Sequence, residues 1–426
     1  MASDPRRLLP EGREGPGVDG PLVVVDAAPL GDEAWLIVMR AASGGLLAAP
    51  VVREHDMVRR AVPSDRVARR LADVLVDPNA SLGPGFDVER VLPGPSSPAG
   101  RERPMLVDQT HESVVVGDDV VVKWSVIAEA TPAPMVVAQL AEAGFEEMAR
   151  PWGFVLWQGD QHAVLVASVA QYLEAASDGW SWAVSDASGF ATGESGLESA
   201  AAPMSDVGRL VADLHIALST ATGVIADPVG MAKSPDVNGW YEGAVALLDE
   251  ALAEVDGPEG ERLRAREHAI RSTLAQIRHV DGTPTIPVHG DLHVGQVLRW
   301  TGGYAVGDFD GNPVLAASER FRPQPAARDV AGMVQSIDHV GRVVSRRVEG
   351  SDPARVGQWI VEARSRFIGA YRARLDEKGK DRLLEDRLLL PFQVEQECRE
   401  YLYAERHLPR WRYVPDQALQ ALFPDR

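Results

Sequence analysis

Two kinds of hydrophobic pattern divide this chain. Up to about residue 171, apolar residues come in short β-branched runs broken by Gly, Asp and Pro, which is typical of strands joined by turns. From residue 205 onward, apolar residues recur every three or four positions, which predicts helices. We therefore expect a sheet-bearing N-terminal part and a mainly helical C-terminal part.

The individual elements follow from these patterns. Residues 105–124 predict a hairpin, because two β-branched runs flank Gly117, Asp118 and Asp119. Residues 77–104 predict an irregular linker, and residues 175–205, rich in Ala, Ser and Gly, predict a flexible excursion. Further strands are expected within 21–54, 154–157 and 162–173, and helices at 64–76, 135–144, 205–218 with Ser205 as N-cap, 240–278, 327–347, 353–377 and 381–407.

Composition narrows the class of protein. The net charge of −19 repels nucleic acid backbones and anionic lipid, so neither is an expected partner, whereas ATP arrives with magnesium and needs only a local cationic site. Cys398 is the single cysteine, which excludes a disulfide within the chain and a cysteine-built zinc site. No apolar run is long enough to cross a bilayer, and the N-terminal residues are polar, so a cytoplasmic location is expected.

The strongest motif lies between the predicted helices. Residues 289–296 read HGDLHVGQ, and residues 307–311 read GDFDG after a short predicted hairpin. Phosphoryl transfer needs a carboxylate that accepts the hydroxyl proton and oxygen ligands for magnesium. Asp291 is the candidate base, and Gln296, five positions later, and Asp308, on the next strand, are candidate metal ligands. The pattern therefore favours an ATP- and Mg²⁺-dependent kinase.

The motif has two other interpretations. HGDLH could be a turn stabilised by its own side chains, and His289 and His293 could be zinc ligands. Zinc is disfavoured because the segment predicts a loop and lacks a third soft ligand, so both histidines are expected to brace the loop.

Lys123 is the second feature that points to phosphate. The chain uses Arg for its ordinary basic positions, and the other lysines, Lys233, Lys378 and Lys380, lie in polar surroundings. Lys123 instead ends an apolar strand, VVVKW. It is a candidate phosphate-binding residue, and the alternative is a surface lysine whose stem lies along apolar side chains.

From about residue 105 to the C-terminus, HGDLHVGQVLRW and VGDFDGNP resemble the aminoglycoside-phosphotransferase-like kinases, specifically the maltokinase branch. The resemblance implies an α/β, bilobal, protein-kinase-like fold with an added β-rich N-terminal cap and a mainly helical C-terminal lobe. It implies three parts: a cap over residues 1–100, an intermediate subdomain over 101–175 with the ATP-contacting strand and hinge, and a helical lobe over 176–426 with the catalytic loop and acceptor site.

The same resemblance suggests roles for single residues. Lys123 would bind the α- and β-phosphates of ATP, and Ser168, Val169 and Ala170 would form the hinge that meets adenine. Asp291 would be the base, Gln296 and Asp308 the magnesium ligands, and Asp310 a third ligand, while His215 is expected to be structural. The chain departs from related kinases in two ways: the loop at 108–113 holds no glycine, and only Glu129 or Glu142 could pair with Lys123.

The acceptor is suggested by the C-terminal stretch from Gln393 to Trp411. On a helix, Glu397 and Glu400 lie three residues apart beside a face that holds Cys398 and Tyr401, and Trp411 follows a break near Pro409. An aromatic platform with two carboxylates suits an amino sugar, although a solvated Glu/Arg face has the same pattern. The stretch resembles that of actinobacterial glucosamine kinases, which implies that the acceptor residues are Asp291, Glu397, Cys398, Glu400, Tyr401 and Trp411.

The resulting expectation is phosphorylation of the 6-hydroxyl of D-glucosamine by ATP. The alternatives are a maltokinase or other sugar kinase, an aminoglycoside phosphotransferase, and a nucleotide-binding regulator without catalysis. The last is disfavoured because Asp291, Gln296 and Asp308 are all present. The sequence does not indicate an oligomeric state.

Overall fold

The computed structural model describes Leu8 and residues 21–55, 57–95, 100–105, 111–159 and 162–424. The chain divides into two compact units. The first comprises Met1–Ala141, Met148–Ala175 and Leu315–Arg320, and the second comprises Glu142–Glu147, Ala176–Val314 and Phe321–Arg426. Residues 108–110 of the loop without glycine, and most of the polar N-terminal segment, lie outside the described residues.

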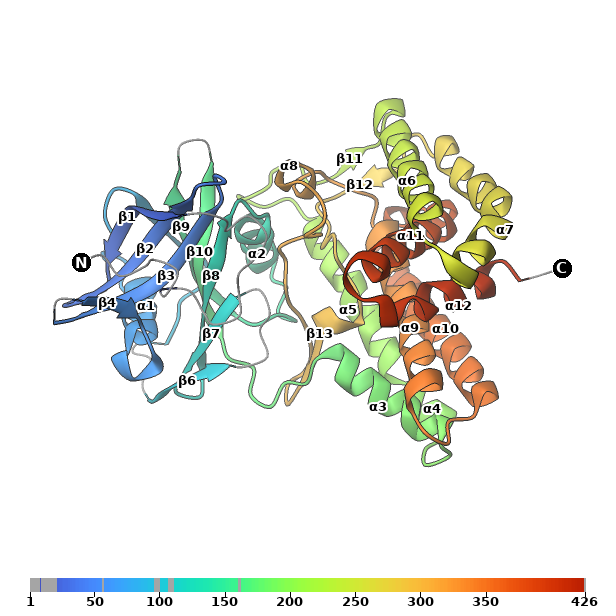
Figure 1. The fold of residues 1–426 in the computed structure, drawn as a ribbon, viewed down its shortest axis with the longest axis horizontal. Coiled ribbons are helices and arrows are strands. Elements are labelled where there is room, and N and C mark those ends of the chain that lie inside the picture. The colour runs from blue at the N-terminus through green and yellow to red at the C-terminus, as the bar shows by residue number, and fades with distance from the viewer. Residues whose placement is uncertain are drawn as a thin grey trace. The chain divides into compact units, whose positions relative to one another are not determined.

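The first unit is built on one antiparallel sheet (Figure 1). Its strands pair in the order β1-β2-β3-β8-β10-β9-β5, with β4 added to β3 and with β7 pairing both β6 and β8. Their bounds are β1 (Leu22–Pro29), β2 (Ala34–Ala41), β3 (Leu46–Glu54), β4 (Met57–Arg60), β5 (Phe86–Arg90), β6 (Glu102–Met105), β7 (His111–Val116), β8 (Val120–Glu129), β9 (Pro151–Gln158) and β10 (Ala163–Gln171).

Alternation along the strands gives this sheet two buried faces. On β2, Leu36 and Val38 join a core that includes Leu71 of helix α1 (Val67–Val76), whereas Ile37 and Met39 join a second core on the opposite face. The first core also contains β8 and β10 residues. The strands expected for the cap and for the intermediate subdomain therefore share one sheet and one core. Helix α2 (Ala133–Glu142) follows β8, as its sequence predicts.

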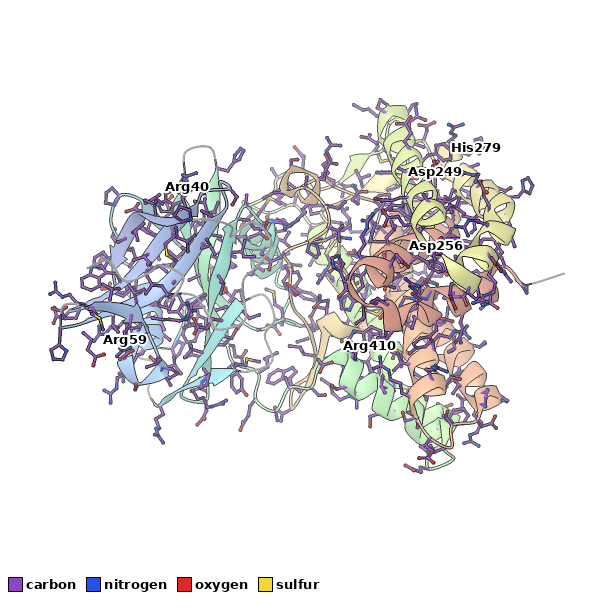
Figure 2. All side chains as sticks on the ribbon, in the orientation of Figure 1. Arg40, Arg59, Asp249, Asp256, His279 and Arg410 are labelled. Carbon is purple, nitrogen blue, oxygen red and sulfur yellow. The ribbon has the colours of Figure 1, made fainter. Side chains whose placement is uncertain are left out.

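The second unit is mainly helical. Helix α10 packs against both α5 and α9 (Figure 1). Asp249 of α6, labelled in Figure 2, pairs with Arg271 of α7. The helices are α3 (Gly179–Ala191), α4 (Leu197–Ala201), α5 (Pro203–Leu218), α6 (Ser234–Glu254), α7 (Gly257–Leu274), α9 (Ala327–Arg347), α10 (Pro353–Glu377), α11 (Leu389–His407) and α12 (Tyr413–Leu422).

Two short antiparallel pairs interrupt these helices. β11 (Gly230–Met231) pairs with β12 (Pro284–Thr285), and β13 (Val297–Trp300) pairs with β14 (Gly303–Val306). The second pair is the hairpin expected between the two sequence motifs. The segment Leu315–Arg320, which contains helix α8 (Ala317–Arg320), belongs to the first unit, whereas Val314 and Phe321 belong to the second.

Several expectations about these elements are confirmed and three are wrong. The helices at 327–347 and 353–377 have the expected bounds. Residues 175–205 are not a flexible excursion, because they contain α3, α4 and the start of α5. Ser205 is not an N-cap, because α5 begins at Pro203. The expected linker at 77–104 contains β5 and most of β6.

Among the residues that the structure describes, no helix combines the length and apolar character needed to span a membrane.

Candidate active site

The loop that carries the HGDLHVGQ motif, residues 289–296, is anchored by a buried carboxylate on α9. Asp329 is 1% exposed and accepts the backbone N–H groups of His289 at 2.8 Å and Gly290 at 2.9 Å. Its Oδ2 also lies 3.2 Å from Nε2 of His215, whose Nδ1 meets the Tyr371 hydroxyl at 2.8 Å. Burial works to raise the pKa of Asp329, but its histidine and backbone donors outweigh burial and lower it. His215 is thus a structural residue, as expected.

The two histidines of the motif also hold the loop. His289 Nδ1 accepts the Asp291 N–H at 3.4 Å, and its Nε2 lies 3.0 Å from the carbonyl oxygen of Gly307. His293 Nδ1 accepts the Gly295 N–H at 3.0 Å. These contacts use both Nδ1 atoms for backbone N–H groups, which supports the bracing role and leaves the zinc alternative without support.

Asp291 has the electrostatics of a general base. Its carboxyl is half-buried, and burial raises its pKa. The nearby His293, His289 and Arg399 oppose the rise, whereas the negative charge of Asp308 adds to it. A carboxylate with a raised pKa accepts a proton more readily, so Asp291 is suited to take the proton of an attacking hydroxyl.

Gln296 and Asp308 are brought together by the β13–β14 hairpin. Val297, next to Gln296, pairs with Val306, two residues before Asp308, and Gln296 Nε2 lies 3.2 Å from Asp308 Oδ2. Asp308 has φ of 64°, in the left-handed region that few residues other than glycine adopt. Such backbone strain is typical of functional sites.

This pair fits magnesium better than a metal that needs many protein ligands. In the described ranges, no three His, Cys, Asp or Glu side chains converge on one metal position. Magnesium is commonly held by one or two carboxylates together with substrate phosphates and water, so it does not need such a cluster. The side chains of Gln296 and Asp308 are adjacent and each carries an oxygen that can bind a metal, and the half-buried Asp310 is two residues further on.

Helix α11 places two carboxylates in different environments. Glu397 is fully buried, and its Oε1 accepts from Gln335 and lies 2.8 Å from His339 Nε2, while its Oε2 is buried without a hydrogen-bond partner. Burial works to lower the pKa of His339, but Glu397 outweighs burial and raises it to about 9. The raised pKa favours the protonated form of His339 at neutral pH, while burial raises the pKa of Glu397 against the opposing effects of His339 and Gln335.

Glu400 is half-buried and faces the motif loop. Its two oxygens accept from Gln396 Nε2 and from Trp411 Nε1, each at 3.2 Å. The charge of Glu400 raises the pKa of His293, although burial is the larger effect and lowers it overall. Glu400 and Trp411, predicted together from sequence, are therefore in direct contact and close to the loop that holds Asp291.

Trp180 links these two groups, and the sequence interpretation missed it. Its ring centroid lies 6.0 Å from that of Trp411, at 86°, and 6.4 Å from that of His293. Trp180 is at the start of α3, where Asp178 caps the helix through the N–H of Ser181. The signal was present as this cap followed by Trp180 and Trp182, but the many Ala, Ser and Gly residues around it obscured it.

Two predicted acceptor residues are not brought to this group. Cys398 is completely buried, and burial raises the pKa of its thiol. Tyr401 is 1% exposed and its hydroxyl donates to Asp416 Oδ1 at 3.2 Å. Both occupy the face of α11 that packs inside the helical unit, so their side-chain contacts do not support a role in acceptor binding. Their helical face was identified correctly, but its direction was not.

In the first unit, Lys123 lies on β8 opposite Ser113 of β7 and Ser168 of β10. It is half-buried between the buried Val122 and Trp124. Neither candidate glutamate pairs with it. Glu129 pairs with Arg320 at 2.8 Å, and Glu142 accepts the N–H of Gly223.

The expected hinge residues lie inside the sheet. Ser168, Val169 and Ala170 are within β10, and each has a partner residue on β8 and on β9. Their backbone groups are directed to neighbouring strands, so they are poorly placed to bind adenine. Just beyond the strand, the Tyr172 N–H still donates to the carbonyl oxygen of Asp119 at 2.8 Å, and residues 173–175 follow, ending at Ala175, which has φ of 56°.

Comparison with known proteins identifies relatives over the full length. No family model matches the chain. It is 45% identical over 433 aligned residues to a glucosamine kinase of Streptacidiphilus jiangxiensis, covering 100% of this chain and 97% of that protein. It is 41% identical to a glucosamine kinase of Mycolicibacterium smegmatis (strain ATCC 700084 / mc(2)155), covering 89% of this chain and 93% of that one.

Solved structures of glucosamine kinases also match this chain over its full length. A glucosamine kinase in complex with glucosamine, ADP and inorganic phosphate matches with a TM-score of 0.85 and 44% identity, covering 99% of this chain and 98% of that one. A second crystal form, described as crystal form B, matches with a TM-score of 0.87 and 43% identity, covering 100% and 98%. Full-length identity at this level, together with the loop and helix described above, shows that the chain belongs to the glucosamine kinase family.

Proposed function

We propose that this protein transfers the γ-phosphoryl group of ATP to the 6-hydroxyl of D-glucosamine. One observation carries the proposal: Trp180 joins the loop that holds Asp291 to Trp411 and Glu400, so a base and a carboxylate lie near the same aromatic side chains. Aromatic rings suit the C–H face of a sugar, and a carboxylate suits its ammonium group. The solved relative with glucosamine and ADP bound supports the same substrates.

In this proposal Asp291 accepts the proton of the 6-hydroxyl as that oxygen attacks the γ-phosphorus. The new bond joins the sugar oxygen to phosphorus, the bond from phosphorus to the β-phosphate oxygen breaks, and ADP leaves. Burial of Asp291 supports the role, because the raised pKa favours proton uptake. Lys123 would bind ATP phosphates, and backbone groups of residues 173–175, rather than 168–170, would contact adenine.

Gln296 and Asp308, with Asp310 as a third candidate, would hold magnesium. A bound magnesium ion would neutralise charge that develops on the phosphoryl oxygens. The support is the contact between the Gln296 amide and the Asp308 carboxylate and the choice of oxygen donors.

The two acceptor carboxylates would have different tasks. Because His339 neutralises Glu397, the uncompensated negative charge is on Glu400, which would bind the ammonium group. The unpartnered Oε2 of Glu397 would accept a hydrogen bond from a substrate group.

The direct test is a screen of glucosamine, glucose, maltose and an aminoglycoside with ATP and Mg²⁺, with the product position assigned by ³¹P and ¹³C NMR. We expect the highest kcat/KM with glucosamine and a phosphate on O6. Preferred turnover of maltose or of the aminoglycoside would overturn the proposal, as would phosphorylation of glucosamine at another hydroxyl.

A further inference from the structure

The tautomer of His293 is fixed by its backbone contact. A neutral imidazole carries one N–H, and Nδ1 of His293 accepts the N–H of Gly295 at 3.0 Å. An imidazolium would present a proton at Nδ1 and could not accept this bond. The proton of His293 is therefore on Nε2, which lies 3.3 Å from the side-chain amide of Gln296.

The side-chain amide of Gln296 lies between the N–H of His293, which requires an acceptor, and the carboxylate of Asp308, which requires a donor. Its nitrogen Nε2 lies 3.3 Å from His293 Nε2 and 3.2 Å from Asp308 Oδ2. In this orientation the amide donates to Asp308, but its N–H groups meet the N–H of His293, and two donors cannot form a hydrogen bond. Contact with His293 is thus unsatisfied when the nitrogen faces Asp308.

Turning the amide by half a revolution reverses both contacts. Its oxygen then accepts the N–H of His293, and the same oxygen faces the carboxylate of Asp308. Two oxygens at this separation repel unless a cation lies between them, and a divalent cation between them would be ligated by both. His293 therefore favours the orientation that binds a cation, whereas Asp308 alone favours the other.

We propose that His293 is a positioning residue that holds the carboxamide oxygen of Gln296 toward the divalent cation. The proposal rests on the proposed function for the cation, but it assigns to His293 a task that is independent of the sugar. The bond from His293 Nε2 selects one of two amide orientations that differ little in shape. Loss of such a bond behind a metal ligand typically weakens metal binding by about 10–100-fold.

Two substitutions at one position separate the two nitrogens of the imidazole. Asparagine places its oxygen near the position of Nδ1, so His293→Asn keeps an acceptor for Gly295 but does not reach Gln296. Glutamine places its nitrogen near the position of Nε2, so His293→Gln keeps a donor to Gln296. We expect His293→Asn to weaken Mn²⁺ binding about tenfold or more and His293→Gln to restore most of it.

The readout is the dissociation constant of Mn²⁺ in the presence of saturating ADP, measured by electron paramagnetic resonance of free Mn²⁺. ADP binding without metal and the thermal midpoint of unfolding show that each variant is folded. An unchanged Mn²⁺ constant in His293→Asn would overturn the proposal, and so would equal weakening in His293→Gln.

A Gln296→Glu background tests the mechanism, because a carboxylate presents an oxygen whichever way it is turned. In that background His293→Asn is expected to change the Mn²⁺ constant by less than threefold, and weakening as large as in the native background would contradict amide orientation as the cause. If the unaltered protein does not phosphorylate glucosamine, the proposed function fails while these metal constants still decide the role of His293.

Discussion

The motif loop and helix α11 both place a carboxylate near histidines, but they use the histidines in opposite ways. Around Asp291, His289 and His293 each accept at Nδ1 the backbone N–H of the residue two positions further on. Beside Glu397, His339 carries a proton and neutralises the carboxylate. A base must be free to take a proton, whereas a buried carboxylate that only binds must be kept ionised by a partner.

The motif loop and the acceptor side also differ in the contacts that hold them in place. The loop is anchored from behind by Asp329, which is buried, ionised and bonded to three donors. On the acceptor side, the Trp411 N–H donates to Glu400, and the Trp411 ring in turn contacts the rings of Trp180 and His339. We therefore expect damage to the loop to affect folding and chemistry, and damage to the aromatic side to affect acceptor affinity.

The largest expected effect is on chemistry at the loop. Asp291→Asn removes the proton acceptor at nearly constant shape, so kcat should fall by about 10²–10⁴-fold. ADP should bind with an unchanged dissociation constant in calorimetry. The exposed Asp281→Asn is the matched control, and a kcat within a few-fold of the unaltered enzyme in Asp291→Asn would remove Asp291 from the mechanism.

Asp329→Ala should break the anchor of the loop. The change leaves the N–H groups of His289 and Gly290 and the Nε2 of His215 without their shared acceptor in a buried place, which costs about 3–5 kcal/mol of unfolding free energy. Urea denaturation followed by far-UV circular dichroism measures it. A loss below about 1 kcal/mol would show that the loop does not depend on this carboxylate.

His339 should make stability depend on pH in the alkaline range. Its pKa of about 9 exceeds the ordinary value near 6.5, so its contribution is fully present below about pH 6.5 and is lost as the pH rises through 9. Near pH 6, the free energy of unfolding of the unaltered protein should be roughly 3 kcal/mol larger than that of His339→Gln. This difference in unfolding free energy should shrink toward zero near pH 10. Urea titrations across this range measure it, and a constant difference would mean that His339 is not charged.

The smallest expected effect is on acceptor affinity. Glu400→Gln replaces a charged acceptor for the ammonium group by a neutral one, a difference of about 1 kcal/mol, so KM for glucosamine should rise roughly fivefold to tenfold. KM for glucose, which lacks the amine, should change little, and the exposed Glu250→Gln should change neither. An equal rise for both sugars would argue against recognition of the amine by Glu400.

The sequence predicted the loop well because its chemistry is local. Asp291, Gln296 and Asp308 are separated by a fixed spacing and a short hairpin, and that hairpin alone brings Gln296 to Asp308. The roles of Asp329 and His339 could not be predicted, because each depends on which helix packs against which. A single aspartate or histidine in an apolar helical pattern does not indicate which loop or helix it will contact in the folded protein.

The misassignments have similar causes. Cys398 and Tyr401 share a helical face with apolar residues, and periodicity fixes which residues share a face but not which face meets the acceptor. The expected hinge residues, 168–170, lie inside the strand pairing, because an apolar run does not show where that pairing stops. Residues 175–205 were misread because Ala-rich composition outweighed the helix-start signal at Asp178.

The left-handed backbone of Asp308 determines how its chemistry can be probed cleanly. Alanine at this position would combine the loss of a carboxylate with a backbone conformation that alanine disfavours, so a loss of activity would have two causes. Asparagine adopts this region more readily than most residues and keeps one of the two side-chain oxygens. Asp308→Asn therefore isolates the charge from the backbone, and a comparison with Asp308→Gly would separate ligand chemistry from conformational preference.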